Sequence, residues 1–487
     1  MKAPFALYPA VLLAATLPAV LAIAFGIRPP DLGRVEDIYL AGQGLLAADG
    51  FTPDFKLYGY PWFILLGWWY RLLHAAGLLA MAAPQGLVDA ASFRDVIAAA
   101  LALQAVMAGA AVLLFHGIAR RLSPPWTAVA LTVVFGGSLG LGAHVTFVAG
   151  EMASGLFLLA ACRLLFAAME ADGLPGLGYL MLVAAFGTLA VMQKSQAVLL
   201  VMAMPWLTVW LARPRPTVVT TGAMAAIPLA AAFALPAWVM LVGAWRGAAY
   251  QPALAVMVLA AMAIVVRRRG QSWRDVALAA SAVAVGVAAA QLLHLIAWDP
   301  AYTGALVNWL EHLSQFGSSA RPGPSQLARN LGTLVVDKGL HVDTFAYPFR
   351  LFYVLAVVGA ALLIRRRRWR ALGLMAVFTG MAVGAEVAFL SRYHSLYYWP
   401  WYFIFIEPWL LLGLATAAGE LGLEPRRPAT RGALLAGAGL FAALGMADAL
   451  QWAPQWRAYQ APSSQPDCEQ VRAYIPKLAP YLEVCRG

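Results

Sequence analysis

The feature that most constrains the fold is a succession of apolar runs, each about 20 residues long, which is enough to cross a bilayer as an α-helix. Backbone groups inside lipid have no water to bond, so such runs must form helices that satisfy their own hydrogen bonds. Only 12% of the 487 residues are charged, against about 25% in soluble proteins. The sequence therefore predicts an all-α polytopic membrane protein.

We expect about thirteen crossings, since each of these runs covers roughly the thickness of the hydrocarbon core. They are predicted at residues 5–27, 95–118, 125–147, 152–169, 177–193, 196–212, 218–243, 251–266, 275–297, 349–364, 371–390, 400–418 and 432–450. The first run has no clear cleavage site, so we interpret it as a retained span. Together the spans define a transmembrane domain at 1–450.

Arginine clusters between the runs set the orientation, because short cytoplasmic loops are enriched in Lys and Arg. The clusters are Arg120–Arg121, Arg213 with Arg215, Arg267–Arg269, Arg365–Arg368 and Arg426–Arg427. They account for most of the net charge of +11 and argue against a nucleic-acid partner. The resulting map has a cytoplasmic N-terminus and an extracytoplasmic C-terminus. The Ala- and Gly-rich, Lys-poor composition is typical of a high-GC bacterial genome, and the location that we predict is a bacterial inner membrane.

Residues 57–83 are long enough to cross the membrane, but we predict that they do not. Arg71 and His74 lie in the middle of this segment, where a charge is costly in lipid. If it crossed, every later arginine cluster would face outward. Its Trp- and Tyr-rich half is typical of a helix that lies in the membrane interface.

Three stretches are then expected outside the membrane on the extracytoplasmic face: the loops 28–94 and 298–348, and the tail 451–487. The tail holds Cys468 and Cys485, which are expected to pair as a disulfide in an oxidising compartment. Cys162 lies inside a predicted span and is interpreted as a packing residue.

Ionisable and aromatic residues gather at the ends of the spans that the map places outside. These site candidates are Glu36, Asp37, Lys56, Tyr58, His144, Glu151, Lys194, His341, Asp343, Tyr347, Arg392, Tyr393 and His394. Each has an ordinary alternative, such as a solvated loop residue or a cation that reaches the head groups. Glu151 is hardest to explain that way, because it interrupts an apolar stretch without a cation nearby in sequence. Such a grouping fits a site for an anionic lipid head group and a polar acceptor.

This arrangement resembles the GT-C superfamily of membrane glycosyltransferases, which use sugars linked to polyprenyl phosphate. It looks most like the branch of the lipid A aminoarabinose transferase and the protein O-mannosyltransferases. The resemblance rests on "VEDIYLAGQGLLAADGFTPDFKLYGYP" after the first span, on Glu151, on Lys194 in "MQKSQA", and on Arg392–Tyr393 with Pro400. It implies a GT-C-type fold with interfacial helices in the outer loops.

The resemblance also implies roles for these residues. The family's acidic pair is usually Asp-Glu, whereas this chain has Glu36-Asp37, and Ser195 replaces the family's usual Gly. We take Asp37 as the general base, with Glu36 as the alternative. Lys194 and Arg392, with Tyr393, would bind the donor phosphate.

The implied partners are a polyprenyl-phosphate-linked sugar and a glycolipid, polysaccharide or protein acceptor. Glu151 would orient the acceptor or help to hold a divalent metal, since family members differ in metal need. The sugar, hexose or pentose, and the oligomeric state are left open by the sequence.

Three other functions are weighed against this one. A transporter or flippase usually places its charges near the bilayer midplane and shows internal repeats, and neither feature is evident here. An O-antigen polymerase or ligase normally has its long loop late in the chain, without an acidic pair after the first span. A structural membrane protein without chemistry is the third.

Overall fold

The computed structural model describes residues 8–25, 35–48, 60–79, 90–146, 148–171, 173–194, 197–211, 273–297, 347–390, 400–459 and 472. Within these ranges every regular element is a helix. The predicted spans at 218–243 and 251–266, and most of the loop 298–348, lie outside the described residues.

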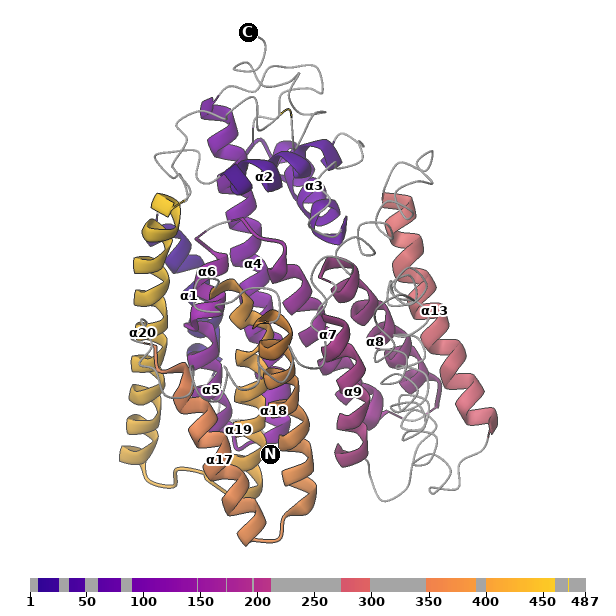
Figure 1. The fold of residues 1–487 in the computed structure, drawn as a ribbon, viewed down its shortest axis with the longest axis vertical. Helices are drawn as coiled ribbons and strands as arrows, with labels where there is room; N and C mark the ends of the chain where they lie inside the picture. Colours follow the sequence, from indigo (N-terminus) through magenta and orange to yellow (C-terminus); the bar gives the residue numbers. More distant parts are fainter. Residues whose placement is uncertain are drawn as a thin grey trace.

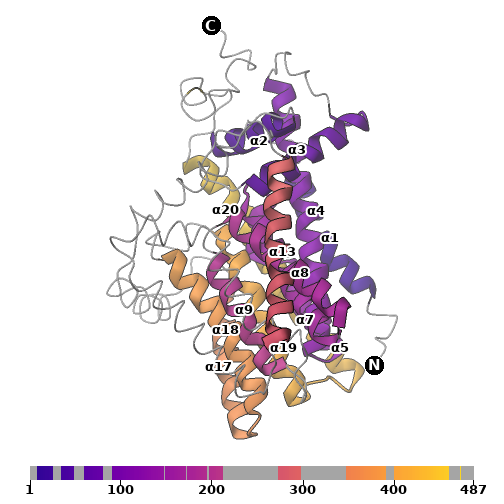
Figure 2. The same cartoon turned by 90° about the vertical axis from the view of Figure 1, so that its right-hand side faces the viewer.

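The long helices run side by side as one bundle (Figures 1 and 2). They are α1 (Tyr8–Phe25), α4 (Ala90–Leu122), α5 (Pro125–Gly136), α7 (Glu151–Glu170), α8 (Gly173–Gln193), α9 (Ala197–Leu211), α13 (Trp273–Ala297), α17 (Phe349–Arg365), α18 (Trp369–Leu390), α19 (Glu407–Leu421) and α20 (Pro428–Tyr459). The short α6 (Leu139–His144) and the 3₁₀-helix η4 (Pro400–Phe405) lie inside it. Two further helices, α2 (Val35–Ala48) and α3 (Tyr60–Ala75), lie at one end.

Six helical segments of the described residues are long and apolar enough to cross a membrane. They are Arg94–Leu122, Pro125–His144, Glu151–Glu170, Gly173–Gln193, Tyr402–Leu421 and Pro428–Gln451. Shorter apolar helices at Tyr8–Leu21, Leu200–Leu211 and Ala277–Ala290 coincide with other predicted spans. The described residues are thus those of a helical, multi-pass membrane protein, while the count of about thirteen crossings stays a prediction.

The predicted span 125–147 is not one continuous helix. The helix α5 starts with Pro125 in its first turn and ends at Gly136, and Ser138 then caps α6 by accepting a hydrogen bond from the Leu141 N–H at 3.4 Å. A side chain at Gly137 would overlap Ala442 of α20. The break therefore lets the chain turn where another helix passes close by.

Apolar packing separates the bundle interior from its lipid-facing surface. The large side chains Trp409, Phe135 and Phe378 are fully buried between helices. The outward face of α17 exposes Val354, Val357 and other aliphatic side chains. Exposed aliphatic residues on one face of an apolar helix are expected where that face meets lipid tails rather than water.

Glycines allow several helices to approach backbone to backbone. In α19, a side chain at Gly419 would overlap the carbonyl oxygen of Leu122 at the end of α4. In α13, a side chain at Gly286 would overlap the carbonyl oxygen of Met181 in α8, along which α13 runs (Figure 2). Small residues at such crossings are typical of helix packing in membranes.

The substitution Gly419→Ala is expected to destabilise the bundle by about 1–3 kcal/mol, because the added methyl group meets backbone that cannot rotate away. Gly439→Ala in α20 is the matched control, since nothing lies within 4 Å of the position where its methyl group would be. The control should be neutral or stabilise by up to about 1 kcal/mol. Denaturant titration in detergent micelles measures both. Equal stabilities for the two variants would contradict the close crossing of α19 and α4.

Candidate functional site

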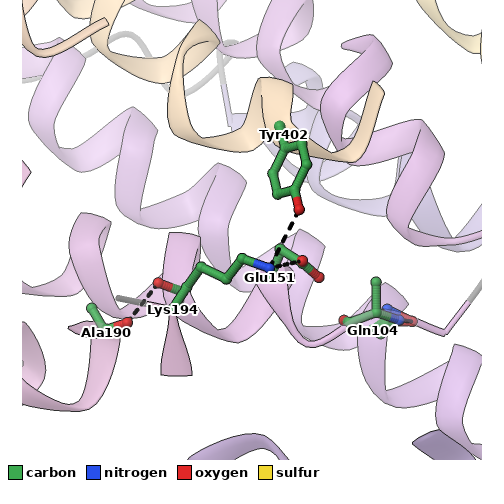
Figure 3. A network of polar contacts seen from close by, with 7 residues as sticks. Gln104, Glu151, Ala190, Lys194 and Tyr402 are labelled. Carbon is green, nitrogen blue, oxygen red and sulfur yellow. Dashed lines mark hydrogen bonds and ion pairs between the residues drawn. The ribbon is translucent and has the colours of Figure 1, made fainter. Parts of the chain in front are cut away.

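A buried ion pair joins the ends of two neighbouring helices. Lys194 Nζ lies 2.6 Å from Glu151 Oε1 (Figure 3). Glu151 is the first residue of α7, and Lys194 directly follows α8. Because α7 and α8 form an antiparallel hairpin, residues 43 positions apart in sequence meet at the same end of the bundle. Glu151 is 0% and Lys194 8% exposed.

Tyr402 of η4 completes the immediate surroundings of the ammonium group. Its hydroxyl accepts a hydrogen bond from Lys194 Nζ at 3.4 Å, and its ring centroid lies 5.2 Å from the same nitrogen. Figure 3 shows Tyr402 reaching toward the ion pair from a different segment of the chain. A cation beside the face of an aromatic ring gains further electrostatic stabilisation in a desolvated site. The site thus draws on three elements: α7, the end of α8, and η4.

Hydrogen bonds from neighbouring helices hold the backbone that carries the pair. The Gln104 side chain in α4 donates to the Ala149 carbonyl at 2.9 Å and accepts from the Ala149 N–H at 3.4 Å, just before Glu151. The Ser154 hydroxyl donates to the Ala190 carbonyl at 2.8 Å, which joins α7 to α8. These contacts fix both helix ends, so the ion pair is built into the bundle rather than formed by mobile side chains.

The second oxygen of Glu151 stands out because the described residues leave it without a hydrogen-bond partner. This atom, Oε2, is buried. Buried carboxylate oxygens normally accept at least one hydrogen bond, because desolvation without compensation is costly. The oxygen is therefore placed to accept a hydrogen bond from a ligand hydroxyl.

Helix α3, which lies at one end of the bundle, is tied to the residue next to Lys194. The Gln193 side-chain oxygen accepts the Trp62 N–H at 2.8 Å, so the end of α8 caps the first turn of α3. Trp62 itself is fully buried. In turn, α3 packs against α2. The segment between the first and second predicted crossings thus contacts the structure around Lys194.

The acidic pair lies in the first turn of α2, which begins at Val35. The side chains of Glu36 and Asp37 lie outside the described part of the structure. So do the predicted site residues Lys56, Tyr58, His341, Asp343, Arg392, Tyr393 and His394, and the cysteines Cys468 and Cys485. Cys162 is buried inside α7 as a free thiol.

The remaining predicted site residues are His144 and Tyr347. His144 at the end of α6 is buried, makes a 2.7 Å contact through Nδ1 with the Gly140 carbonyl, and lies within electrostatic range of Glu151 and Lys194. Tyr347 is buried in a second polar cluster around Glu407. The structure thus brings Glu151, Lys194 and His144 together and places Tyr347 in the neighbouring cluster.

Sequence reasoning missed several polar residues that build this region. Tyr402 lies in a run of Tyr and Trp residues that is typical of the membrane interface, and Gln193 is a neutral residue beside Lys194. The acids Glu386, Glu407 and Asp448 are all buried. Each of these acids interrupts a predicted apolar span, which is itself a signal of function or specific packing in a membrane protein.

The described residues do not by themselves form a metal site. They contain no group of three His, Cys, Asp or Glu side chains that is arranged to hold a metal ion. One oxygen of Glu151 is bound by the Lys194 ammonium, which competes with any cation. A divalent metal would need ligands from elsewhere in the chain.

Comparison with known proteins gives structural likeness only. No protein-family model matches the chain, and no protein of curated function matches it. The chain is similar to the oligosaccharyltransferase of Archaeoglobus fulgidus tethered with an acceptor peptide, with TM-score 0.46, 13% identity, and 94% of this chain and 55% of that one covered. It is also similar to the oligosaccharyltransferase AglB of the same organism in complex with an inhibitory peptide and a dolichol-phosphate. That comparison has a TM-score of 0.48 and 13% identity, and it covers 94% of this chain and 56% of that one. The chain spans about half the length of these proteins. A likeness at this level assigns no role to any residue.

Removing one member of the ion pair is expected to leave a buried charge without its partner. Lys194→Met should therefore lower the free energy of unfolding by about 3–5 kcal/mol. The double variant Lys194→Met/Glu151→Gln should recover part of this loss, because no isolated charge remains. Denaturant titration in micelles measures the difference.

Arg368→Gln is the matched control, since it breaks an ion pair with Glu420 whose side chains are 57% and 40% exposed. It should cost no more than about 1 kcal/mol. If Lys194→Met lowered the free energy of unfolding by no more than this control, the Glu151–Lys194 pair would not be the buried interaction described above.

Proposed function

We propose that this protein is an integral-membrane glycosyltransferase that moves a sugar from a polyprenyl-phosphate donor to an envelope acceptor. The observation that carries the proposal is the buried Lys194–Glu151 pair with Tyr402, set at one end of a helical bundle. A site that handles a lipid phosphate at a membrane face needs a fixed cation within reach of the apolar donor chain. The resemblance of the sequence motifs to the GT-C superfamily supports the same function.

Lys194 is proposed to bind the phosphate of the donor. In the transition state this phosphate gains negative charge as it leaves the sugar, and a nearby ammonium group stabilises that charge. The contacts to Glu151 and Tyr402 hold Nζ in one place, so little reorganisation is needed during the reaction. Arg392 and Tyr393 are proposed to assist at the same phosphate, as the resemblance implies.

Asp37 is proposed as the general base, with Glu36 as the alternative. The base takes the proton of the acceptor hydroxyl while that oxygen bonds to the anomeric carbon and the bond from that carbon to the phosphate oxygen breaks. Polyprenyl phosphate leaves with the bonding electron pair. The helix that carries both acids, α2, packs on α3, and α3 is capped by Gln193 beside Lys194. This chain of contacts supports a shared site for base and cation.

Glu151 is proposed to orient the acceptor through Oε2, which has no hydrogen-bond partner among the described residues. The acceptor would be a glycolipid, a polysaccharide or a protein, and the transferred sugar a hexose or a pentose. On the proposed topology the reaction takes place at the extracytoplasmic face of a bacterial inner membrane. The clustered arginines at the opposite helix ends support this orientation.

Release of polyprenyl phosphate from its sugar-linked form on addition of acceptor is the measurement that tests this function. The purified protein should catalyse it, and Asp37→Asn should abolish it, since loss of a general base removes about 10²–10⁴-fold in rate. The same variant should express and unfold like the unmodified protein. Arg368→Gln, far from the site in the exposed pair with Glu420, should keep full turnover.

Each other outcome has a definite meaning. Turnover retained in Asp37→Asn but lost in Glu36→Gln or Glu151→Gln would move the base to that residue. Binding of polyprenyl phosphate without release by any acceptor would favour a carrier and contradict a transferase. Mass analysis of envelope glycolipids with and without the protein would then identify sugar and acceptor together, as a difference of one sugar unit.

A further inference from the structure

Two segments that carry site side chains meet at one buried acid. The first segment is η4, which bears Tyr402, and the second is α6, which bears His144. Glu407 lies directly after η4, at the start of α19, and is fully buried. Its Oε2 accepts the Gly140 N–H of α6 at 3.2 Å, and Ser138, just before α6, lies near its carboxyl group. Glu407 thus joins the two segments by a hydrogen bond between residues 267 positions apart in sequence.

The junction is too close to tolerate a side chain at residue 140. A Cβ atom there would lie 2.7 Å from Glu407 Oε2 and 2.8 Å from the Ile404 backbone nitrogen. Gly140 therefore lets the backbone of α6 lie directly on η4. A shift of either segment would break the bond to Glu407, so the bond sets their relative position.

Two apolar contacts hold η4 on its other sides. Ile404 fits against Gly155 of α7, where a Cβ atom would lie 2.6 Å from the Ile404 side chain. Phe403 meets Phe349 edge to face, with ring centroids 4.6 Å apart. Gly155 is about one turn along α7 from Glu151, so η4 is anchored close to the ion pair. Tyr402 is the η4 residue whose hydroxyl reaches Lys194.

A further buried acid extends this cluster to α20. The Tyr347 N–H, just before α17, donates to Asp448 Oδ2 of α20 at 2.6 Å. The hydroxyl of Tyr347 lies beside the Glu407 carboxyl group. Elements from both halves of the chain therefore converge on Glu407. Unlike Glu151, Glu407 has no cationic partner in any ion pair of the described residues.

We propose that Glu407 is a positioning residue of the candidate site, which holds Tyr402 and His144 in place beside Lys194 and Glu151. This inference rests on the proposed function for the identity of the ligand, a polyprenyl phosphate. Glu407 touches neither Lys194 nor the ligand. It acts through the position of η4. This role requires an oxygen that accepts the Gly140 N–H and does not require a negative charge.

Binding of undecaprenyl phosphate to the purified protein in detergent provides the first test. Glu407→Leu removes the acceptor and should weaken binding about 2–10-fold, which corresponds to the loss of one neutral hydrogen bond. Glu407→Gln keeps a carbonyl oxygen for the Gly140 N–H and should bind within about 2-fold of the unmodified protein. If Glu407→Gln fails as badly as Glu407→Leu, an acceptor at this position is not enough and the proposal is wrong.

A double-mutant cycle separates positioning from general loss of structure. Tyr402→Phe removes the hydroxyl that Lys194 bonds and should weaken binding by itself. If Glu407 acts through η4, the double variant Glu407→Leu/Tyr402→Phe should bind no more weakly than Glu407→Leu alone. Losses that multiply would show that the two residues act independently and would overturn the proposal. Should Glu407→Leu not fold, Gly140→Ala takes its place in the cycle, because the added methyl group would push α6 away from Glu407 and η4.

Hydrogen exchange gives a readout that does not depend on the ligand. In Glu407→Leu the amides of residues 401–406 should exchange faster, while those in the middle of α7 should keep their protection, and Glu407→Gln should resemble the unmodified protein. If the unmodified protein does not bind undecaprenyl phosphate, the proposed function fails, and this measurement still decides whether Glu407 holds η4. Unchanged exchange at 401–406 in Glu407→Leu would refute the positioning role.

Discussion

The ion pair between Glu151 and Lys194 is the interaction around which the rest of the site is arranged. Either charge alone would strongly destabilise the fold at a site so well removed from water, because a buried ion without a partner loses far more hydration free energy than packing contacts recover. The pair therefore requires that α7 and α8 end at the same level and stay there. The bonds from Gln104 to Ala149 and from Ser154 to Ala190 meet this requirement.

Glycines fix the relative positions of the backbone segments, as the ion pair fixes the two helix ends. In lipid, helices gain little from burying apolar surface against each other, so close contact and polar bonds must supply the attraction. A methyl group would force two elements apart at three glycines. They are Gly140, which packs against η4, Gly155, which packs against Ile404, and Gly419, which packs against Leu122. The first two of these contacts surround η4, which presents Tyr402 to Lys194. Packing and polar geometry are thus coupled at the same segment.

The positions of the described helices could largely be predicted from sequence. The predicted spans 152–169 and 349–364 correspond closely to α7 (Glu151–Glu170) and α17 (Phe349–Arg365), because hydropathy alone determines which stretches can lie in lipid. The break between α5 and α6 was missed. It depends on the close passage of Ala442 at Gly137, a contact between segments far apart in sequence.

The candidate site was less accessible to sequence reasoning, for a similar reason. Glu151 and Lys194 were both singled out, but nothing in sequence tells which helix ends meet, so their contact at 2.6 Å emerged only from the fold. Gln193 and Tyr402 carry no signal of their own, since one is neutral and the other lies in an aromatic run. Glu407 did carry one, as an acid within the predicted span 400–418. That signal is ambiguous, because an acid near the end of a span can also reach the polar head groups.

The two buried acids, Glu151 and Glu407, have different roles in the same bundle. Glu151 forms an ion pair with Lys194, and its Oε2 has no hydrogen-bond partner among the described residues. Glu407 accepts the Gly140 backbone N–H through Oε2, a contact that needs an acceptor but not a charge, and its Oε1 has no hydrogen-bond partner among the described residues. A site for a charged lipid phosphate benefits from this division. Lys194 supplies the charge that meets the phosphate in the proposed reaction, and the bond from the Gly140 N–H to Glu407 holds the η4 segment that presents Tyr402 to that ammonium group.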